Sequence, residues 1–236
     1  YFSFFWYTAG NVSVSKDCFT IYKYNFAPGA DDVTGTMNPV LKEESATITL
    51  PKETYERDGN SFKDWKSTAG IFEDGAKISA NPASGFEDTL TALWAENQYA
   101  YTVKYYLMGL DGEYPSDPGQ TKTFYAGYDA QISSDSEALK LDLTGFTRDD
   151  SEGKKSSITI TEDGKTLNVY YSRNLYDLTL SYTKPGDSEA TVSTTAYYFG
   201  ADLTTVLGDA AKPAAEGYVF VGWFFGDTGD KPSTMP

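Results

Sequence analysis

Apolar and polar residues alternate along several short stretches of the chain. The clearest is 176–183, in which residues 176, 178, 180 and 182 are apolar or aromatic and the residues between them are polar. A period of two places alternate side chains on opposite faces of a strand, so this stretch predicts a half-buried strand. The same pattern recurs, less regularly, in 19–24 and 101–106. We expect each of the three strands to open one structural unit.

Two further stretches, 89–94 and 166–171, predict strands that close a unit. Each has three apolar residues at alternate positions, which one face of a strand would present together. They are Leu90, Ala92 and Trp94 in the first, and Leu167, Val169 and Tyr171 in the second. The joints that follow, 95–100 and 172–175, contain no Pro or Gly and no Ser-rich spacer. Short joints leave little freedom between units, so the pattern predicts a semi-rigid rod of modules.

Helical and turn signals are fewer. Asp202 can cap a short helix over 202–207, and 136–141 can form a matching turn or two. Asp163-Gly164 lies between 158–160 and 167–169 and predicts a hairpin. Each unit is therefore expected to run strand, turn, strand, short helix, strand. This predicts a β-rich α+β fold in which one helix lies across a small sheet.

Two aromatic signatures recur in register, which is typical of repeat architectures. Gly59-x-x-Phe62-x-x-Trp65 is followed later by Gly217-x-x-Phe220-x-x-Trp223, and Thr89-Leu90-x3-Trp94-x2-Asn97 by Thr166-Leu167-x3-Tyr171-x2-Asn174. The tryptophans could stack on sugar rings, but large aromatics dominate the cores of small domains. We therefore predict a structural core motif made of Gly59, Phe62, Trp65, Trp94, Tyr171, Gly217, Phe220 and Trp223.

Charge and composition narrow the function. The chain has 19 Lys and Arg against 34 Asp and Glu, a net charge of −15, and no His. Binding to a phosphate backbone needs clustered basic residues, so nucleic acid is not expected as a partner. Without His, a Ser-His-Asp or Cys-His site is impossible and the commonest metal ligand is missing. We predict no catalytic residues, no metal, no cofactor and no enzymatic activity.

Three other groups of residues were candidates for chemistry. Cys18 is the only cysteine, has no basic catalytic neighbour, and is expected to be a buried apolar residue. The acidic clusters at 31–32, 149–152 and 227–230 lack the spaced ligands of an EF-hand loop and are expected to be solvated loops. Tyr114, Tyr125 and Tyr128 are the better glycan candidates. No apolar run is long enough to span a bilayer, so no membrane insertion is predicted.

The repeated motifs resemble the InlB B-repeat, or Listeria-Bacteroides repeat, modules of bacterial surface proteins. In the first unit the resemblance is carried by 34–37, Leu50-Pro51, 59–65 and 89–94; in the third it is carried by 217–223 and 233–236. The middle unit departs from the pattern, because Gly145-Phe146 has no Trp three residues further on. It is similar to MucBP-type modules, through Tyr-Thr-Val-x-Tyr-Tyr at 101–106 and Leu-x-Val-Tyr-Tyr at 167–171.

The resemblance implies tandem β-grasp-like (ubiquitin-like) modules of a secreted or wall-anchored protein of Gram-positive or gut bacteria. The expected boundaries are 1–18 for the end of a preceding module, 19–98 and 175–236 for InlB B-repeat-like modules, and 99–174 for a MucBP-like module. The third is expected to be incomplete at its C-terminus. The expected function is a stalk that also binds a host protein or glycan. The alternative is an accessory carbohydrate-binding module of a secreted polysaccharide-active enzyme.

Overall fold

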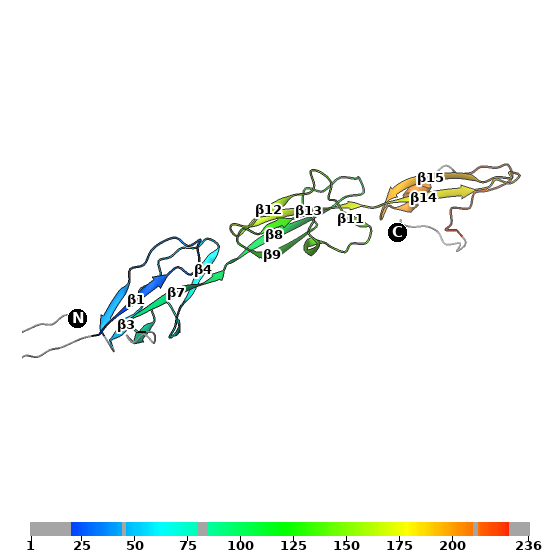
Figure 1. The fold of residues 1–236 in the computed structure, drawn as a ribbon. Coiled ribbons are helices and arrows are strands. Elements are labelled where there is room, and N and C mark those ends of the chain that lie inside the picture. Colours follow the sequence, from blue (N-terminus) through cyan, green and yellow to red (C-terminus); the bar gives the residue numbers. More distant parts are fainter. Residues whose placement is uncertain (1–19, 44–45, 80–84, 210–211, 227–236) are drawn as a thin grey trace, which may run out of the picture. The chain divides into compact units, whose positions relative to one another are not determined.

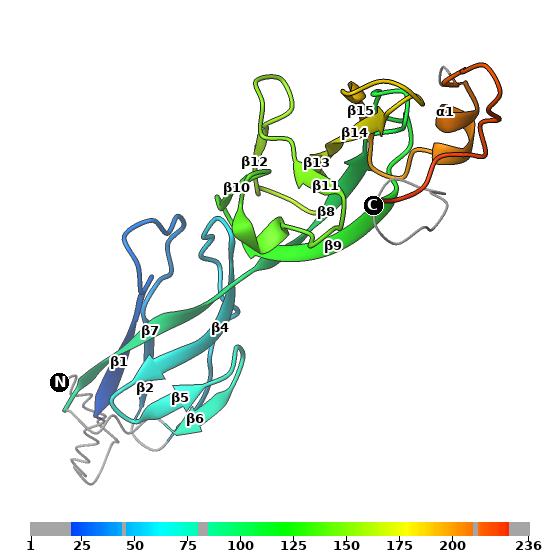
Figure 2. The ribbon, with the colours of Figure 1, turned by 90° about the vertical axis from the view of Figure 1, so that its right-hand side faces the viewer.

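Strands dominate the computed structural model of the chain, which describes residues 20–43, 46–79, 85–209 and 212–226. Figures 1 and 2 show that almost every element is a strand, so the predicted β-rich class is confirmed. The chain divides into two compact units between Tyr99 and Ala100, with Gly127–Asp129 grouped with the first. We call 20–98 the first module, 99–174 the middle module and 175–226 the third module.

The first module is built on a five-stranded sheet in the order β2-β1-β7-β4-β5. Its first and last long strands are adjacent and parallel, and the other neighbouring pairs are antiparallel. A small second sheet pairs β3 with β6. The strands are β1 (Ile21–Ala27), β2 (Val40–Glu43), β3 (Thr47–Thr49), β4 (Asn60–Ser67), β5 (Gly70–Phe72), β6 (Lys77–Ser79) and β7 (Glu87–Glu96).

Trp65 occupies the centre of this module's core. It is 0% exposed and its ring lies 4.9 Å from Phe62, 5.1 Å from Phe26 and 6.2 Å from Tyr55, measured between centroids. Leu90 of β7 is also fully buried. The alternation read from the sequence thus puts one face of β7 against the aromatic cluster, and burial of such large side chains is the main stabilising term in a small domain.

The middle module repeats this arrangement with different residues. Its four-stranded sheet has the order β11-β13-β8-β9, in which the first and last strands, β8 and β13, are again adjacent and parallel. A two-stranded sheet pairs β10 with β12. The elements are β8 (Gln98–Leu107), β9 (Gln120–Gly127), β10 (Gln131–Ser133), the 3₁₀ turn η1 (Glu137–Leu139), β11 (Phe146–Arg148), β12 (Ser157–Thr159) and β13 (Lys165–Arg173).

The two strand orders correspond position by position. Reading β9-β8-β13-β11 against β2-β1-β7-β4 matches each strand to the one with the same place in its module. The predicted alternation is visible in β8 and β13, where every second residue is buried. These buried residues are Tyr101, Val103, Tyr105, Leu167, Val169 and Tyr171. The middle module therefore has the strand order of the first, although its motifs differ.

The third module begins with the antiparallel pair β14 (Leu175–Tyr182) and β15 (Thr191–Tyr198), followed by the helix α1 (Leu203–Asp209). Leu178, Leu180 and Tyr182 are half-buried and alternate with exposed residues, as the pattern predicts, whereas Tyr176, predicted on the same face, is exposed. The predicted capping is also present: Asp202 accepts a 2.9 Å hydrogen bond from the amide of Thr204.

Each joint between modules consists of a single asparagine. Asn97 separates β7 from β8, and Asn174 separates β13 from β14. The Asn97 amide donates to Gly59 (2.8 Å) and its side-chain oxygen accepts from Ser61 (2.6 Å). The Asn174 amide donates to Gly145 (2.9 Å) and its side-chain oxygen accepts from Thr147 (2.8 Å). At each joint the asparagine is thus hydrogen-bonded, through its backbone and its side chain, to the module that it follows.

Gly145 also defines a contact between the middle and third modules inside the second unit. It has φ 78°, and a Cβ added to it would lie 2.2 Å from the Phe199 ring. Arg173 lies over the Phe146 ring at 4.6 Å and donates to the carbonyls of Met108 and Phe199, both at 2.9 Å. Because only glycine accepts both this backbone angle and this contact, Gly145 is specified by the junction.

Two of the predicted elements are wrong. Residues 158–160 and 167–169 do not form a hairpin, because β12 pairs with β10 whereas β13 pairs with β8 and β11. The Asp163-Gly164 turn is instead held to the start of β8, where the Ala100 amide donates to Asp163 at 2.7 Å and the Gly164 amide donates to Ala100 at 2.9 Å. The helix expected in every unit is also absent from the described residues of the first module.

Candidate interaction surface on the third module

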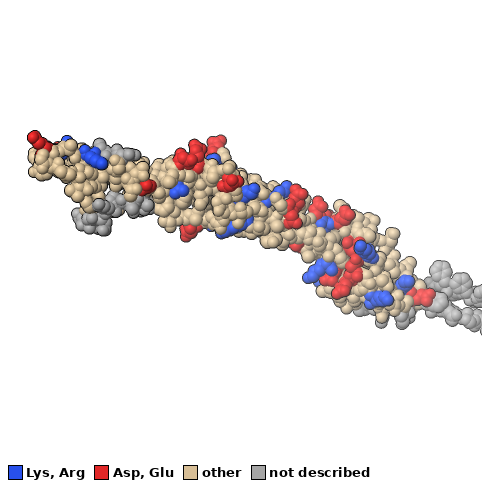
Figure 3. All heavy atoms as spheres, turned by 180° about the vertical axis from the view of Figure 1, so that it is seen from behind, with Lys and Arg blue, Asp and Glu red and all other residues tan. Residues whose placement is uncertain are grey.

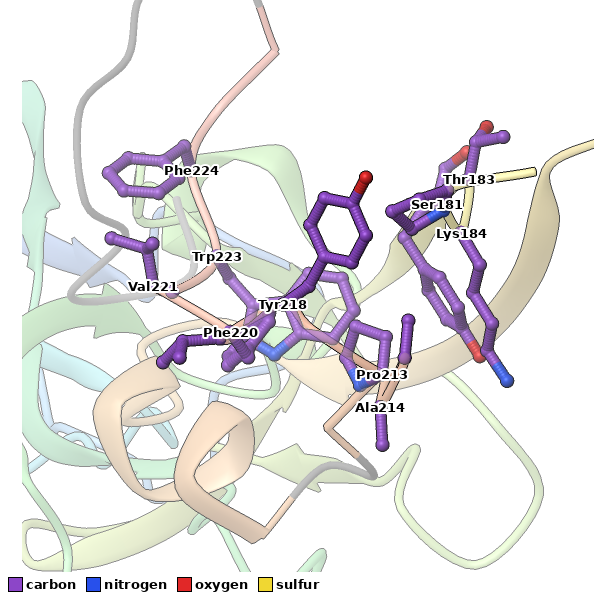
Figure 4. A pocket seen from close by; sticks show the side chains of 15 residues that line it. Ser181, Thr183, Lys184, Pro213, Ala214, Tyr218, Phe220, Val221, Trp223 and Phe224 are labelled. Atoms are coloured by element: carbon purple, nitrogen blue, oxygen red, sulfur yellow. The ribbon is translucent and has the colours of Figure 1, made fainter. Parts of the chain in front are cut away.

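The third module carries a cavity of about 410 Å³ beside the end of β14. Figure 4 shows side chains of the segment 213–224 gathered opposite Ser181, Thr183 and Lys184. The lining is mainly apolar: its larger side chains are Tyr182, Pro213, Tyr218, Val219, Phe220, Val221, Trp223 and Phe224. Val219 is 88% exposed and Val221 81% exposed. An exposed apolar groove of this kind is typical of a binding surface.

Trp223 lies at the centre of the groove. Its ring contacts Phe220 at 5.3 Å and Tyr182 at 6.1 Å, both edge to face. The indole Nε1 is buried without a hydrogen-bond partner among the described residues. In the first module Trp65 likewise packs on the Phe three residues before it, Phe62, and on an aromatic residue of the opening strand, Phe26. Phe26 and Tyr182 lie at non-equivalent positions of the two opening strands, and among the described residues only Trp65 has a further ring contact, with Tyr55.

The cover over the two tryptophans differs. Trp65 lies in β4, which pairs with β7, and Leu90 and Ala92 of β7 are buried in the same core. The third module has no strand over 217–223, and β14 pairs only with β15 among the described residues. One edge of β14 is therefore unpaired in the part of the chain that the structure describes. An unpaired edge next to an apolar groove is a site for strand addition.

The eight residues of the predicted core motif have different surroundings. Trp65 and Tyr171 are fully buried, and Gly59 is a buried turn residue with φ 68°. Phe62 and Trp94 are half-buried against the first core, where Trp94 donates to the carbonyl of Pro28 at 2.8 Å. In the third module Phe220 and Trp223 are half-buried in the groove and Gly217 is exposed.

Tyr114, one of the glycan candidates, belongs to an aromatic cluster of the middle module. Its ring lies 5.0 Å from Tyr170, and the Lys154 ammonium lies 4.6 Å and 4.8 Å from the two ring centroids. The Tyr114 hydroxyl donates to Asp149 at 2.7 Å. Burial and this carboxylate raise the pKa of Tyr114. Lys154 therefore covers the faces that a sugar ring would stack on.

Tyr125 is the glycan candidate most accessible to a ligand. Its side chain is 68% exposed on β9, whereas Tyr128 is 38% exposed. Among the described residues, the ring contact of Tyr128 is with Tyr99 and that of Tyr114 is with Tyr170, so no ring contact joins the three candidate tyrosines.

The acidic clusters pair with basic or hydroxyl groups. The guanidinium of Arg57 lies 2.9 Å from Asp32 and lowers the pKa of that carboxyl. Burial alone would raise the pKa of Asp149, but hydrogen bonds from Ser151 and Tyr114 lower it. No group of three potential metal ligands occurs among the described residues. The third acidic cluster, 227–230, and Cys18 lie outside the described residues.

Figure 3 shows acidic and basic side chains interspersed on the face that it presents, without a continuous basic patch. Within the described ranges, no helix has the length and hydropathy needed to cross a membrane. Two features of the site have no signal in the sequence, the Lys154 ammonium over the Tyr114 and Tyr170 rings and the open edge of β14. The aromatic spacing of 217–223 was visible in the sequence, but which strand covers it is a question of pairing.

No protein-family model matches this chain, and no curated protein matches it either.

Proposed function

We propose that this chain is a structural and adhesive repeat segment of a secreted or wall-anchored bacterial surface protein. In this proposal β-grasp-like modules follow one another in a semi-rigid rod that carries a binding region or itself binds a host protein or glycan. The observation that carries it is the single strand order, found twice in succession, in which the first and last strands are parallel neighbours. Repetition of one module is the usual way to build a spacer.

The joints support the rod. A closing strand and the next opening strand are separated by one residue at each joint, and that residue is bonded back to the preceding module. In the proposed rod, long strands that continue from one module to the next would hold successive modules end to end. A flexible string would instead need spacers rich in Gly, Ser or Pro.

Small-angle X-ray scattering tests the rod. Three modules end to end, with strands of about ten residues at about 3.3 Å each, give a length near 100 Å and a radius of gyration of about 30 Å. A compact globule of 236 residues would have a radius of gyration of about 18 Å. A value near the smaller figure would contradict the rod, whatever the chain binds.

Binding assays separate the adhesive function from the accessory-module alternative. The labelled chain is applied to mucin, to host extracellular-matrix proteins and to plant polysaccharides. We expect retention on a host-derived surface and none on the polysaccharides. Retention on the polysaccharides that the Tyr125→Ala variant abolishes would support the alternative instead. The structure favours the alternative less, because Lys154 covers the rings of Tyr114 and Tyr170.

A further inference from the structure

We propose that the first module binds a primary alkylammonium group, of the kind that a lysine side chain carries, in a cavity lined by the carboxylate of Asp88. This deepens the proposed adhesive function, because a lysine of the bound host protein would supply the group. The inference rests on that function only for the identity of the partner, since the cavity and its charge belong to the first module alone.

The cavity has a volume of about 220 Å³ and lies between the main sheet of the first module and the strand β6 of its second sheet. It combines aromatic rings, hydroxyl groups and one side chain of each charge. The lining residues are Tyr24, Ser67, Ala69, Phe72, Lys77, Ile78, Ser79 and Asp88. Apolar walls with a few polar groups are typical of a ligand site, and this size suits one long side chain.

Asp88 is a buried carboxylate without a cationic partner. It is 6% exposed and lies on the same face of β7 as the buried Leu90 and Ala92. The carboxylate accepts hydrogen bonds from the Thr89 amide at 2.8 Å and from the Thr68 hydroxyl at 3.3 Å. Within the described ranges, no Lys or Arg forms an ion pair with it. A buried charge of this kind is costly, so its surroundings favour a positive group.

The middle module has a charged residue at the same position, but there the charge is paired. Asp88 lies opposite Tyr24 and Lys165 lies opposite Tyr101, and each precedes the repeated Thr-Leu of its closing strand. Lys165 forms a 3.0 Å ion pair with Glu162. The two modules therefore differ at this position in whether the chain supplies the opposite charge.

The chain around the cavity offers little to neutralise Asp88. Lys77 lines the cavity, but it is exposed and forms no ion pair with Asp88. The segment 80–84, which has the sequence Ala-Asn-Pro-Ala-Ser, contains neither Lys nor Arg. An ammonium from another molecule could donate to Asp88 and to the Ser67 hydroxyl, because it has three N–H donors. The ring of Phe72 in the same wall would add to the attraction of a cation.

An NMR titration of the 236-residue chain with Nα-acetyl-lysine N-methylamide tests the site. We expect saturable shifts at the backbone amides of Thr68 and Thr89, because both residues donate to the Asp88 carboxylate. The norleucine analogue lacks only the ammonium group and should give no such shifts. Equal shifts with the two compounds, or none with the lysine compound, would overturn the proposal without the need for any variant.

Three variants identify the charge that matters. Asp88→Asn keeps the shape of the side chain and should weaken binding of the lysine compound by roughly tenfold or more, since it removes the buried charge. Asp58→Asn removes the same charge from an exposed turn of this module and is the matched control. Lys77→Gln should bind at least as tightly as the parent, because it removes a like charge. Unchanged binding in Asp88→Asn, or weaker binding in Lys77→Gln, would contradict the assignment.

Competition separates this site from the proposed adhesive function. The lysine compound should release the labelled chain from a host-derived surface, and the norleucine analogue should not. Binding of the lysine compound to a chain that no host surface retains would refute the adhesive function and support the cavity assignment. Retention of a chain that does not bind the lysine compound would overturn the cavity assignment alone.

Discussion

The first and third modules carry the same aromatic signature in different surroundings. Trp65 is fully buried in a strand, whereas the segment around Trp223 forms no strand and lines an open groove. Each tryptophan packs on the Phe three residues before it and on one aromatic residue of its opening strand. What differs is β7, which pairs with β4 and closes the first core. The signature therefore becomes a core only where a parallel closing strand covers it.

The largest expected effects come from replacing each tryptophan with Ala and comparing the two losses of stability. Trp65→Ala should destabilise the first unit by about 3–5 kcal/mol, because it leaves a large cavity in a packed core. Trp223→Ala should cost less than about 2 kcal/mol, since its site is half-open. Native-state hydrogen exchange of β7 and β14, measured by mass spectrometry in both variants, reports the two costs separately. Equal costs would break the comparison.

Substitution of Gly145 tests the junction between the middle and third modules. Gly145→Ala should cost about 2–3 kcal/mol, because it combines a strained positive φ with a clash against the Phe199 ring. Gly153→Ala is the matched control: φ is 85°, but nothing lies within 4 Å of the added Cβ, so only the strain of about 1 kcal/mol remains. Urea unfolding of the second unit measures both. An equal loss of stability in the two variants would show that the contact with the Phe199 ring adds nothing to the cost of Gly145→Ala.

The asparagine joints should give a smaller effect. Asn174→Ala removes the 2.8 Å hydrogen bond from Thr147 but keeps the backbone bond to Gly145. We expect a loss of about 0.5–1.5 kcal/mol, the usual net value of one hydrogen bond. Faster amide exchange should appear in β11 and at the start of β14. The exposed Ser188→Ala variant is the control, and a loss as large there would remove the special role of the joint.

The smallest expected effect concerns pH. Hydrogen bonds from Lys155 and then Ser133 lower the pKa of Asp135 to about 2 in the folded middle module, against about 3.9 in an unfolded chain. Because the folded pKa is the lower one, the contribution of this carboxylate is complete above about pH 4 and is lost as the pH falls towards 2. Asp135→Asn should flatten the acid dependence of the urea midpoint in this window. Asp187→Asn should leave it unchanged.

The sequence predicted much of the local structure and little of the pairing. Alternation identified the opening and closing strands because burial of one face requires it, and the Asp202 cap was visible because capping is local. The parallel contact of β8 with β13 is formed by residues about 60 positions apart. No local pattern encodes that contact, and a hairpin at Asp163-Gly164 was therefore predicted where the chain instead crosses to the other sheet.

The candidate surface shows the same limit. The motif at 217–223 predicts core aromatics, and in the structure Phe220 and Trp223 contact each other but are only half-buried and line the groove. It could not indicate whether a strand covers them, because that depends on a partner elsewhere. The cover of Lys154 over Tyr114 and Tyr170 was also invisible in the sequence, since the three residues come from separate parts of the module.

The most direct test of the closing strand is to supply one in cis. Residues 224–236 are replaced by 66–96 of the first module, so that Trp223 is followed by the segment that follows Trp65 and the chain ends in β7. A second chimera with Leu90→Asp and Ala92→Asp in the graft is the control. Hydrogen exchange of β14 is then compared in the parent and both chimeras. The account predicts strong new protection of β14 only in the first chimera; unchanged exchange there would contradict it.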